Sequence, residues 1–163
     1  MEPIEVKVKK LRPSAQLPYQ ADPGSVGFDL RADLFDEEIQ LTALKTVLLP
    51  NQQAKIHTGI AVEIPENHFM MIFPRSSMGV KKNLILKNTV GIIDSSYRGE
   101  ILLFVKNIGD TPIEIDNGER IAQAVIIPYP KVSYVESDTL SETSRGDGGF
   151  GSTNFDKFGN KIL

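Results

Sequence analysis

The sequence predicts an all-β protein, built as an antiparallel sandwich, jelly roll or barrel. Short runs of β-branched and aromatic residues recur along the chain, and Pro, Gly, Asn and Asp separate them. No window of a dozen residues places apolar side chains at helical spacing. Because strands joined without helical crossovers pair in antiparallel sheets, these observations favour an all-β architecture.

The expected strands follow in chain order. Residues 4–8, IEVKV, alternate apolar and charged side chains, as a half-buried strand does. Residues 23–32, PGSVGFDLRA, read as a turn that leads into a strand with Asp29 near its start. Further strands are expected at 46–50, 54–64, 68–73, 100–107, 112–115, 120–128 and 132–136. Turn chemistry separates several of them, as in PENH, NIGDTP and DNGE.

Length and composition indicate one domain followed by an arm. The chain has 163 residues and a net charge of −3, which gives no support for binding to nucleic acid or to a membrane. It contains no cysteine and no apolar targeting segment, so a cytoplasmic protein is expected. The strand pattern ends near Glu136. We therefore predict a β domain over residues 1–137 and a flexible arm over 138–163, which is polar and rich in glycine.

The arginines indicate an anionic ligand or a set of structural ion pairs. Five of the six arginines lie in short segments rich in Gly, Ser and Asp, and a guanidinium suits bidentate contact with phosphate. In FPRSSMG, residues 73–79, an arginine, two hydroxyls and a glycine directly follow a strand and could form an anion nest or an ordinary turn. No helix is expected behind this segment, so it is not a Walker loop.

The segment 87–100, KNTVGIIDSSYRGE, holds a candidate general base. Its apolar stretch leads to Asp94 at the head of a polar turn. Tyr97 could pack on a sugar, and the amide of Asn88 could read the edge of a base. The alternative is a β-hairpin whose turn uses Asp and Ser in the usual way.

Two later segments add weaker signals. Gln123 lies in GERIAQA, residues 118–124, and on local evidence alone it is an ordinary strand residue. In SRGDGGFGSTN, residues 144–154, bare glycine backbone can approach phosphates, Arg145 adds positive charge and Phe150 could stack on a base. Asp29 alone reads as a turn cap. Neither His57 nor His68 has a partner at metal-ligand spacing, and both are expected to be surface or strand residues.

Together, in this order and spacing, the five segments resemble the homotrimeric deoxyuridine triphosphatase (dUTPase) family over about residues 22 to 153. The resemblance implies an antiparallel β jelly roll, a distorted barrel, in which three chains share three active sites. It also implies that the protein hydrolyses dUTP to dUMP and pyrophosphate, which limits uracil in DNA and supplies dUMP. The implied cofactor is Mg²⁺, carried mainly by the substrate phosphates.

The resemblance implies a role for each matched residue. Asp94 would activate the attacking water, and Asp29 would touch the magnesium shell through water. Tyr97 would pack on the deoxyribose, and Asn88 with the backbone of 91–94 would read uracil. The implied substrate-binding residues are Arg75, Ser76, Ser77, Asn88, Gly91, Ile92, Ile93, Tyr97, Gln123, Arg145, Phe150, Gly151, Ser152 and Thr153. For Arg31, Arg98 and Arg120, structural ion pairs are expected instead.

Two other functions are compatible with such a fold. A dCTP deaminase would need a carboxylate beside the base, yet residues 101–107, ILLFVKN, contain neither Asp nor Glu. A binding module would keep the pocket and act on a regulatory protein partner. The presence of Asp94 favours catalysis, and a partner role can coexist with it.

Overall fold

The computed structural model describes residues 3–36 and 38–149. The chain divides into two compact units, Met1–Lys131 and Val132–Leu163, and each is described by itself. The first unit contains one helix, α1 (Ser76–Lys82), among its described residues. Its strands are β1 (Lys7–Lys10), β2 (Phe28–Arg31), β3 (Phe35–Asp36), β4 (Leu41–Thr42), β5 (Lys45–Leu48), β6 (Gln53–His57), β7 (Ile60–Glu63), β8 (His68–Pro74), β9 (Leu84–Leu86), β10 (Gly91–Ile93), β11 (Leu102–Asn107), β12 (Ile113–Asp116) and β13 (Arg120–Pro128).

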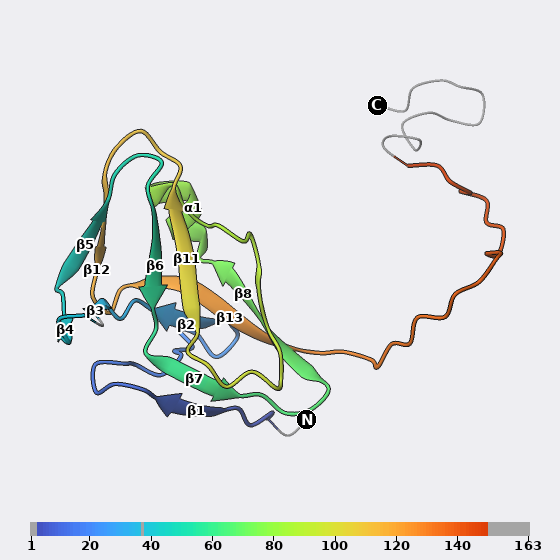
Figure 1. Ribbon diagram of the computed structural model, residues 1–163, viewed down its shortest axis with the longest axis horizontal. Helices are drawn as coiled ribbons and strands as arrows, with labels where there is room; N and C mark the ends of the chain where they lie inside the picture. Colours follow the sequence, from blue (N-terminus) through green and yellow to red (C-terminus); the bar gives the residue numbers. More distant parts are fainter. Residues whose placement is uncertain (1–2, 37, 150–163) are drawn as a thin grey trace. The chain divides into compact units, whose positions relative to one another are not determined.

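The strands form small antiparallel sheets around one core (Figure 1). The largest sheet has the order β10-β8-β13-β2, and a second has the order β6-β11-β9. β1 pairs with β7, β5 with β12, and β3 with β4. The architecture confirms the predicted all-β, jelly-roll-like fold.

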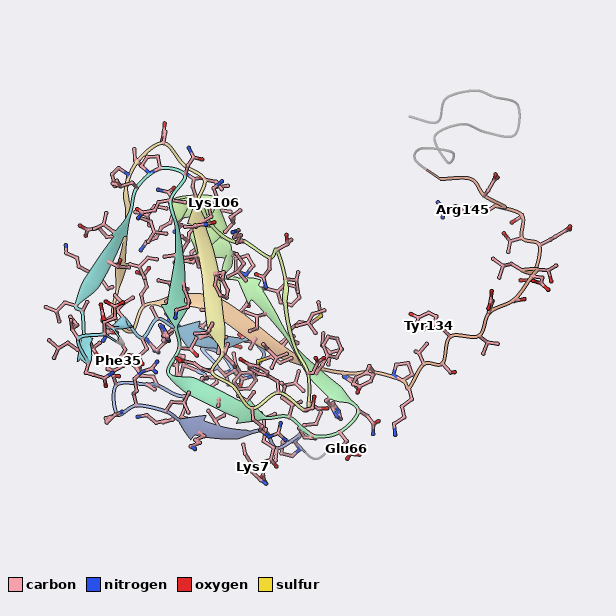
Figure 2. All side chains as sticks on the ribbon, viewed as in Figure 1. Lys7, Phe35, Glu66, Lys106, Tyr134 and Arg145 are labelled. Atoms are coloured by element: carbon pink, nitrogen blue, oxygen red, sulfur yellow. The ribbon has the colours of Figure 1, made fainter. Side chains whose placement is uncertain are left out.

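The core follows from alternation along the strands. In β11, Leu103, Val105 and Asn107 are buried, and the residues between them are more exposed. β12 alternates in the same way, so that Ile113 and Ile115 point inward. Side chains from both larger sheets join one continuous cluster that includes Leu30, Ile72, Leu84, Leu103 and Ala122. Figure 2 shows side chains filling the space between the strands of this unit.

The predicted strand at 54–64 is wrong in one respect, because the structure has two strands there. β6 ends at His57 and β7 begins at Ile60, and Gly59 lies between them with φ +69°. The chain thereby leaves the sheet with β11 and joins β1 instead. A single glycine within an apolar run does not distinguish a corner from a bulge or a plain strand residue.

The expectation that no helix follows Arg75 is also wrong. α1 begins at Ser76, with Arg75 as its extended N-cap residue, and ends at Asn83 in the left-handed conformation. Only Met78 of this helix is buried. A helix of two turns buries too little apolar surface to leave a periodic pattern in the sequence.

The second unit differs from its prediction. Residues 132–136 were expected to form a strand, but the described part of this unit, 132–149, contains no helix or strand. Tyr134, labelled in Figure 2, is 97% exposed and Val135 is 83% exposed. Among the described residues of the whole chain, no helix is long and apolar enough to cross a membrane.

Candidate active site

Three neighbouring strands place a row of candidate residues on the largest sheet. Asp29 of β2 lies opposite Gln123 of β13, and Gln123 lies opposite Phe73 of β8. β8 continues directly to Arg75 and the start of α1. The register therefore brings together residues that are up to 94 positions apart in the sequence, which sequence spacing alone does not show.

This row forms the wall of an open, polar pocket of about 430 Å³. Four of the predicted site residues line it: Asp29, Arg75, Ser76 and Gln123. The remaining lining residues are Ala21, Ser25, Val26, Gly27, Phe73 and Val125. Ser77, the neighbour of Ser76, is half-buried in α1 and is not part of this lining.

Asp29 holds two arginines at the pocket. Its carboxylate is buried, and its Oδ1 lies 2.8 Å from Nε of Arg75. Its Oδ2 accepts a hydrogen bond of 3.0 Å from Arg120. Arg75 also donates to the backbone carbonyl of Arg120 at 3.1 Å. Arg75 lines the pocket, whereas Arg120 contacts Asp29 without being part of the lining. The three side chains together carry one net positive charge, which suits an anionic ligand.

Gly27 lets Gln123 lie against the backbone of the pocket. A Cβ at Gly27 would lie 2.6 Å from Oε1 of Gln123, so no other residue fits there without a shift. Nε2 of Gln123 donates to the carbonyl of Pro74 at 3.2 Å. The role of Gly27 was missed in the sequence, where a glycine within PGSVGF reads only as part of a turn.

The other predicted group of residues lies on β10 and the loop that follows it. Gly91 lies opposite Ile72 and Ile93 opposite Met70, so β10 is the edge strand of the largest sheet. Asn88 is exposed before this strand, and Asp94 is exposed after it. The carbonyl of Asp94 accepts a hydrogen bond from the amide of Tyr97 at 3.1 Å, which closes a tight turn.

Tyr97 folds back over its own turn. Its hydroxyl donates to the carbonyl of Glu100 at 3.0 Å. A Cβ at Gly99 would lie 2.6 Å from Cζ of the Tyr97 ring, so the ring packs directly on the glycine backbone. Tyr97 is nevertheless 42% exposed, so part of its side chain stays accessible.

One chain does not bring the two groups together. β8 and β13 separate β10 from β2, and Asp94 lies beyond the pair Ile93–Met70, away from the row of Phe73. None of the residues from Asn88 to Tyr97 lines the pocket around Asp29. The chain thus presents an arginine-lined pocket and a separate polar hairpin.

The arm carries the last predicted residues. Arg145 is exposed, and its Nε donates to the carbonyl of Gly148 at 2.8 Å, which closes a short turn within the second unit. Figure 2 labels this side chain. Phe150, Gly151, Ser152 and Thr153 lie outside the described residues.

Arg31, Arg98 and Arg120, for which ion pairs were expected, differ in their partners. Arg120 forms the expected ion pair, with Asp29. Arg31 instead donates to the carbonyl of Gly118 at 2.8 Å and lies over the ring of Tyr19. Arg98 donates to the carbonyls of Ser95 and Tyr97 within its own turn. Among the described residues, neither Arg31 nor Arg98 forms the expected ion pair, and backbone carbonyls accept their hydrogen bonds instead.

The described residues contain no group of three His, Cys, Asp or Glu side chains that could hold a metal ion. Asp29 is the carboxylate that faces the pocket, and both of its oxygens already contact arginine. This donor set does not form a protein cage for a metal. It fits an ion that arrives with a phosphate ligand and meets Asp29 through water.

The fold and the pocket define an all-β protein with a polar, arginine-lined site for an anionic ligand. Comparison with known proteins defines it further. The dUTPase family model matches residues 13–154. The chain is 43% identical over 150 residues to the deoxyuridine 5'-triphosphate nucleotidohydrolase of Hydrogenobaculum sp. (strain Y04AAS1), covering 92% of this chain and 98% of that protein.

Further comparisons agree. The corresponding protein of Desulfitobacterium hafniense (strain DSM 10664 / DCB-2) is 43% identical over 156 residues, covering 94% of this chain and 98% of its own. The dUTPase of Staphylococcus bacteriophage 80alpha, solved with dUpNHpp, superposes with a TM-score of 0.79 at 26% identity. That match covers 91% of this chain and 98% of the phage chain. The chain belongs to the dUTPase family.

Proposed function

We propose that the protein is a dUTP diphosphatase, which hydrolyses dUTP to dUMP and pyrophosphate. The observation that carries this proposal is the pocket in which Arg75, Ser76 and Gln123 surround Asp29, in a chain of the dUTPase family. Relatives at 43% identity are deoxyuridine 5'-triphosphate nucleotidohydrolases, and the phage 80alpha enzyme was solved with the nucleotide analogue dUpNHpp.

The pocket around Asp29 binds the triphosphate. Arg75 supplies a guanidinium, while Ser76, Ser77 and Gln123 supply hydroxyl and amide donors to the phosphate oxygens. Asp29 keeps Arg75 oriented through its contact at 2.8 Å. Because this ion pair already exists in the free protein, phosphate binding needs little reorganisation of Arg75.

The β10 hairpin selects the nucleoside. The side chain of Asn88 and the backbone of Gly91, Ile92 and Ile93 offer donors and acceptors to the polar edge of uracil. The ring of Tyr97 packs on the deoxyribose and leaves no room for a 2′-hydroxyl. The support from geometry is the position of Tyr97, which the contact with Gly99 and the bond to Glu100 fix on the turn.

Asp94 acts as the general base. It takes a proton from water, the water oxygen forms a bond to the α-phosphorus, and the bond from that phosphorus to the bridging oxygen breaks. The products are dUMP and pyrophosphate. The exposed carboxylate at the head of the turn is open to both water and substrate.

Mg²⁺ accompanies the substrate, and when bound it neutralises negative charge on the phosphates. Asp29 is the residue that would contact its water shell. Arg75 and Gln123 keep their roles toward the phosphate oxygens whether or not the ion is present.

The active site is shared between chains of a homotrimer. The arginine-lined pocket and the hairpin lie apart within one chain, so a complete site needs the pocket of one subunit and the hairpin of another. The arm, residues 138–163, follows the β domain, 1–137, and closes over the bound nucleotide. Arg145 then adds charge near the phosphates, Phe150 stacks on uracil, and Gly151, Ser152 and Thr153 contact the phosphates. Given its substrate, a cytoplasmic location suits the protein.

A nucleotide panel tests the proposal. Purified protein with Mg²⁺ is incubated separately with dUTP, dCTP, dTTP and UTP, and the products are resolved by anion-exchange chromatography. Conversion of dUTP alone to dUMP and pyrophosphate is the expected result. Conversion of dCTP to a uracil nucleotide would instead assign a deaminase, and no turnover of any nucleotide by the folded protein would assign a binding module.

A further inference from the structure

A cluster of charged side chains holds the C-terminal end of the loop that carries Asp94. The loop leaves the largest sheet at Ile93 and enters the second sheet at Leu102, so it crosses between the two sheets. Glu100 lies at the end of this crossing, six residues after Asp94. Its side chain is 13% exposed, in contrast with the exposed Asp94.

Four donors occupy the carboxylate of Glu100. Oε1 accepts from the amide of Gly59 at 2.7 Å and from Arg12 at 2.5 Å. Oε2 accepts from Arg12 at 3.3 Å and lies 2.9 Å from Nδ1 of His57. Each oxygen thus has two hydrogen-bonding contacts, which restrain the side chain.

The partners of Glu100 come from segments far apart in the sequence. Arg12 follows β1, and its Nε also donates to the buried Asp33, which follows β2, at 2.9 Å. The guanidinium of Arg12 lies 4.8 Å from the ring centroid of Phe35, labelled in Figure 2. His57 and Gly59 flank the corner between β6 and β7. We define the Arg12–Glu100 cluster as Arg12, Asp33, His57, Gly59 and Glu100. It joins the loop to segments next to β1, β2, β6 and β7.

The backbone next to Glu100 is also hydrogen-bonded to the corner between β6 and β7. The amide of Ile101 donates to the carbonyl of Ile60 at 2.9 Å, and the hydroxyl of Thr58 donates to the carbonyl of Ile101 at 2.7 Å. The carbonyl of Glu100 itself accepts from the hydroxyl of Tyr97. A displacement of Glu100 thus moves Tyr97 directly and moves Asp94 through the turn.

The charge state of Glu100 strengthens its contacts with Arg12. Burial alone raises the pKa of Glu100, but the hydrogen bonds from Arg12, His57 and the Gly59 amide outweigh it and lower the pKa below its ordinary value of 4.5. The carboxylate is therefore ionised at neutral pH and forms a charge-assisted pair with Arg12 inside the protein.

We infer that Glu100 and Arg12 are positioning residues for the proposed reaction: they hold the loop so that Asp94 and Tyr97 meet the nucleotide in a fixed geometry. This inference rests on the proposed function for its catalytic consequence. Neither residue touches the substrate. Their effect on rate arises because a misplacement of about 1 Å in a catalytic group costs about 100-fold in rate.

The test replaces Glu100 with its neutral isostere, Glu100→Gln. A milder variant, Arg12→Lys, keeps the charge but loses the planar fork and stays informative if Glu100→Gln does not fold. Ile115→Val serves as the stability control, since Ile115 is fully buried in β12 and contacts no part of the loop by sheet pairing. Glu114→Gln serves as the chemical control, because Glu114 forms an exposed ion pair with Lys45 in β5.

Two readouts are compared in these variants. Hydrogen exchange measured by mass spectrometry reports on the peptide that covers residues 94–101. Each variant is compared with Ile115→Val under conditions in which the two proteins have the same free energy of unfolding. We expect exchange of this peptide to be about tenfold faster in Glu100→Gln and Arg12→Lys than in either control. We also expect kcat for dUTP to fall about 10- to 100-fold with KM little changed, because the misplaced base acts mainly in the transition state.

Each outcome decides one claim. Exchange in residues 94–101 that matches the stability control would overturn the positioning role, whatever the activity of the wild-type protein. Faster exchange with an unchanged kcat would overturn its catalytic consequence. If the wild-type protein does not hydrolyse dUTP, the proposed function is wrong, and the exchange data still decide whether the cluster positions the loop.

Discussion

Asp94 is the single residue on which the proposed chemistry depends. It stands exposed at the head of a turn closed by the amide of Tyr97. Asp94→Asn keeps the size of the side chain and removes its basicity and charge. We expect kcat for dUTP to fall by about 10² to 10⁴ while the fold and nucleotide binding persist. Steady-state kinetics together with calorimetric binding of dUpNHpp measure both effects, and turnover near that of the wild type would refute the role of Asp94.

Gly99 controls the position of Tyr97. The variant Gly99→Ala would place a methyl group against the ring, because the space between them is already filled. We expect the displaced ring to admit a 2′-hydroxyl, so that the ratio of kcat/KM for UTP to that for dUTP rises about tenfold. Tyr97→Phe keeps the ring and loses only the bond to Glu100, and it should change this ratio less. Equal ratios in Gly99→Ala and the wild type would exclude Tyr97 as the residue that rejects ribose.

The sequence singled out hydroxyls, guanidinium groups and a carboxylate between strands because such groups have a limited set of uses, and their roles toward a ligand stay predictions. Asp29, Arg75, Ser76 and Gln123 do line one pocket. The contacts of Arg12 and Glu100 could not be predicted, since their charges lie 88 positions apart and meet only through the fold.

At the scale of elements, the corner between β6 and β7 depends on the backbone conformation of Gly59. Gly59 has φ +69°, and a Cβ there would lie 2.5 Å from Cβ of Ala15. Gly59→Ala should therefore lower the free energy of unfolding by about 1–3 kcal/mol. Gly79→Ala in α1 is the matched control, because no atom lies within 4 Å of a Cβ there and helix interiors favour alanine. Denaturant unfolding that ranks the two variants equally would contradict this account.

The Arg12–Glu100 cluster also predicts how stability responds to acid. The folded pKa of Glu100 is lower than its ordinary value of 4.5, so its stabilising effect is complete above that pH and is lost as the pH falls through 4.5 toward the folded pKa. Arg12 stays charged throughout this range, because its hydrogen bonds to Glu100 and Asp33 raise the pKa of its guanidinium further. The difference in the free energy of unfolding between the wild type and Glu100→Gln should shrink below about pH 4.5. Denaturant unfolding between pH 3 and 7 measures it, and a constant difference would contradict the assignment.

Alternation and turn chemistry predicted most strands, and β8 and β13 lie close to their expected ranges. The errors have physical causes. α1 is too short for a helical period to appear, and residues 132–136 alternate like a strand but have no partner strand among the described residues of their unit. A strand forms only where another strand accepts its hydrogen bonds, and a sequence pattern does not contain that information.

At the scale of the whole molecule, the largest sheet separates the two halves of the proposed site. The pocket around Asp29 and the hairpin around Asp94 belong to different parts of β10-β8-β13-β2. No pattern in the sequence reveals this separation, because motifs are ordered along the chain and not in space. The proposed assembly of the site between subunits rests on this separation, since the nucleotide needs phosphate donors and a base at once.

Subunit complementation tests this account most directly. Arg75→Gln removes the phosphate guanidinium, Asp94→Asn removes the base, and each variant alone should be nearly inactive. After the two are unfolded together and refolded, mixed trimers should regain dUTP hydrolysis, because about one site in three of each mixed trimer then combines an intact pocket with an intact hairpin. Native mass spectrometry of differently tagged subunits confirms that mixed trimers have formed. Recovered hydrolysis is the predicted result, whereas mixed trimers that stay inactive would contradict the shared site.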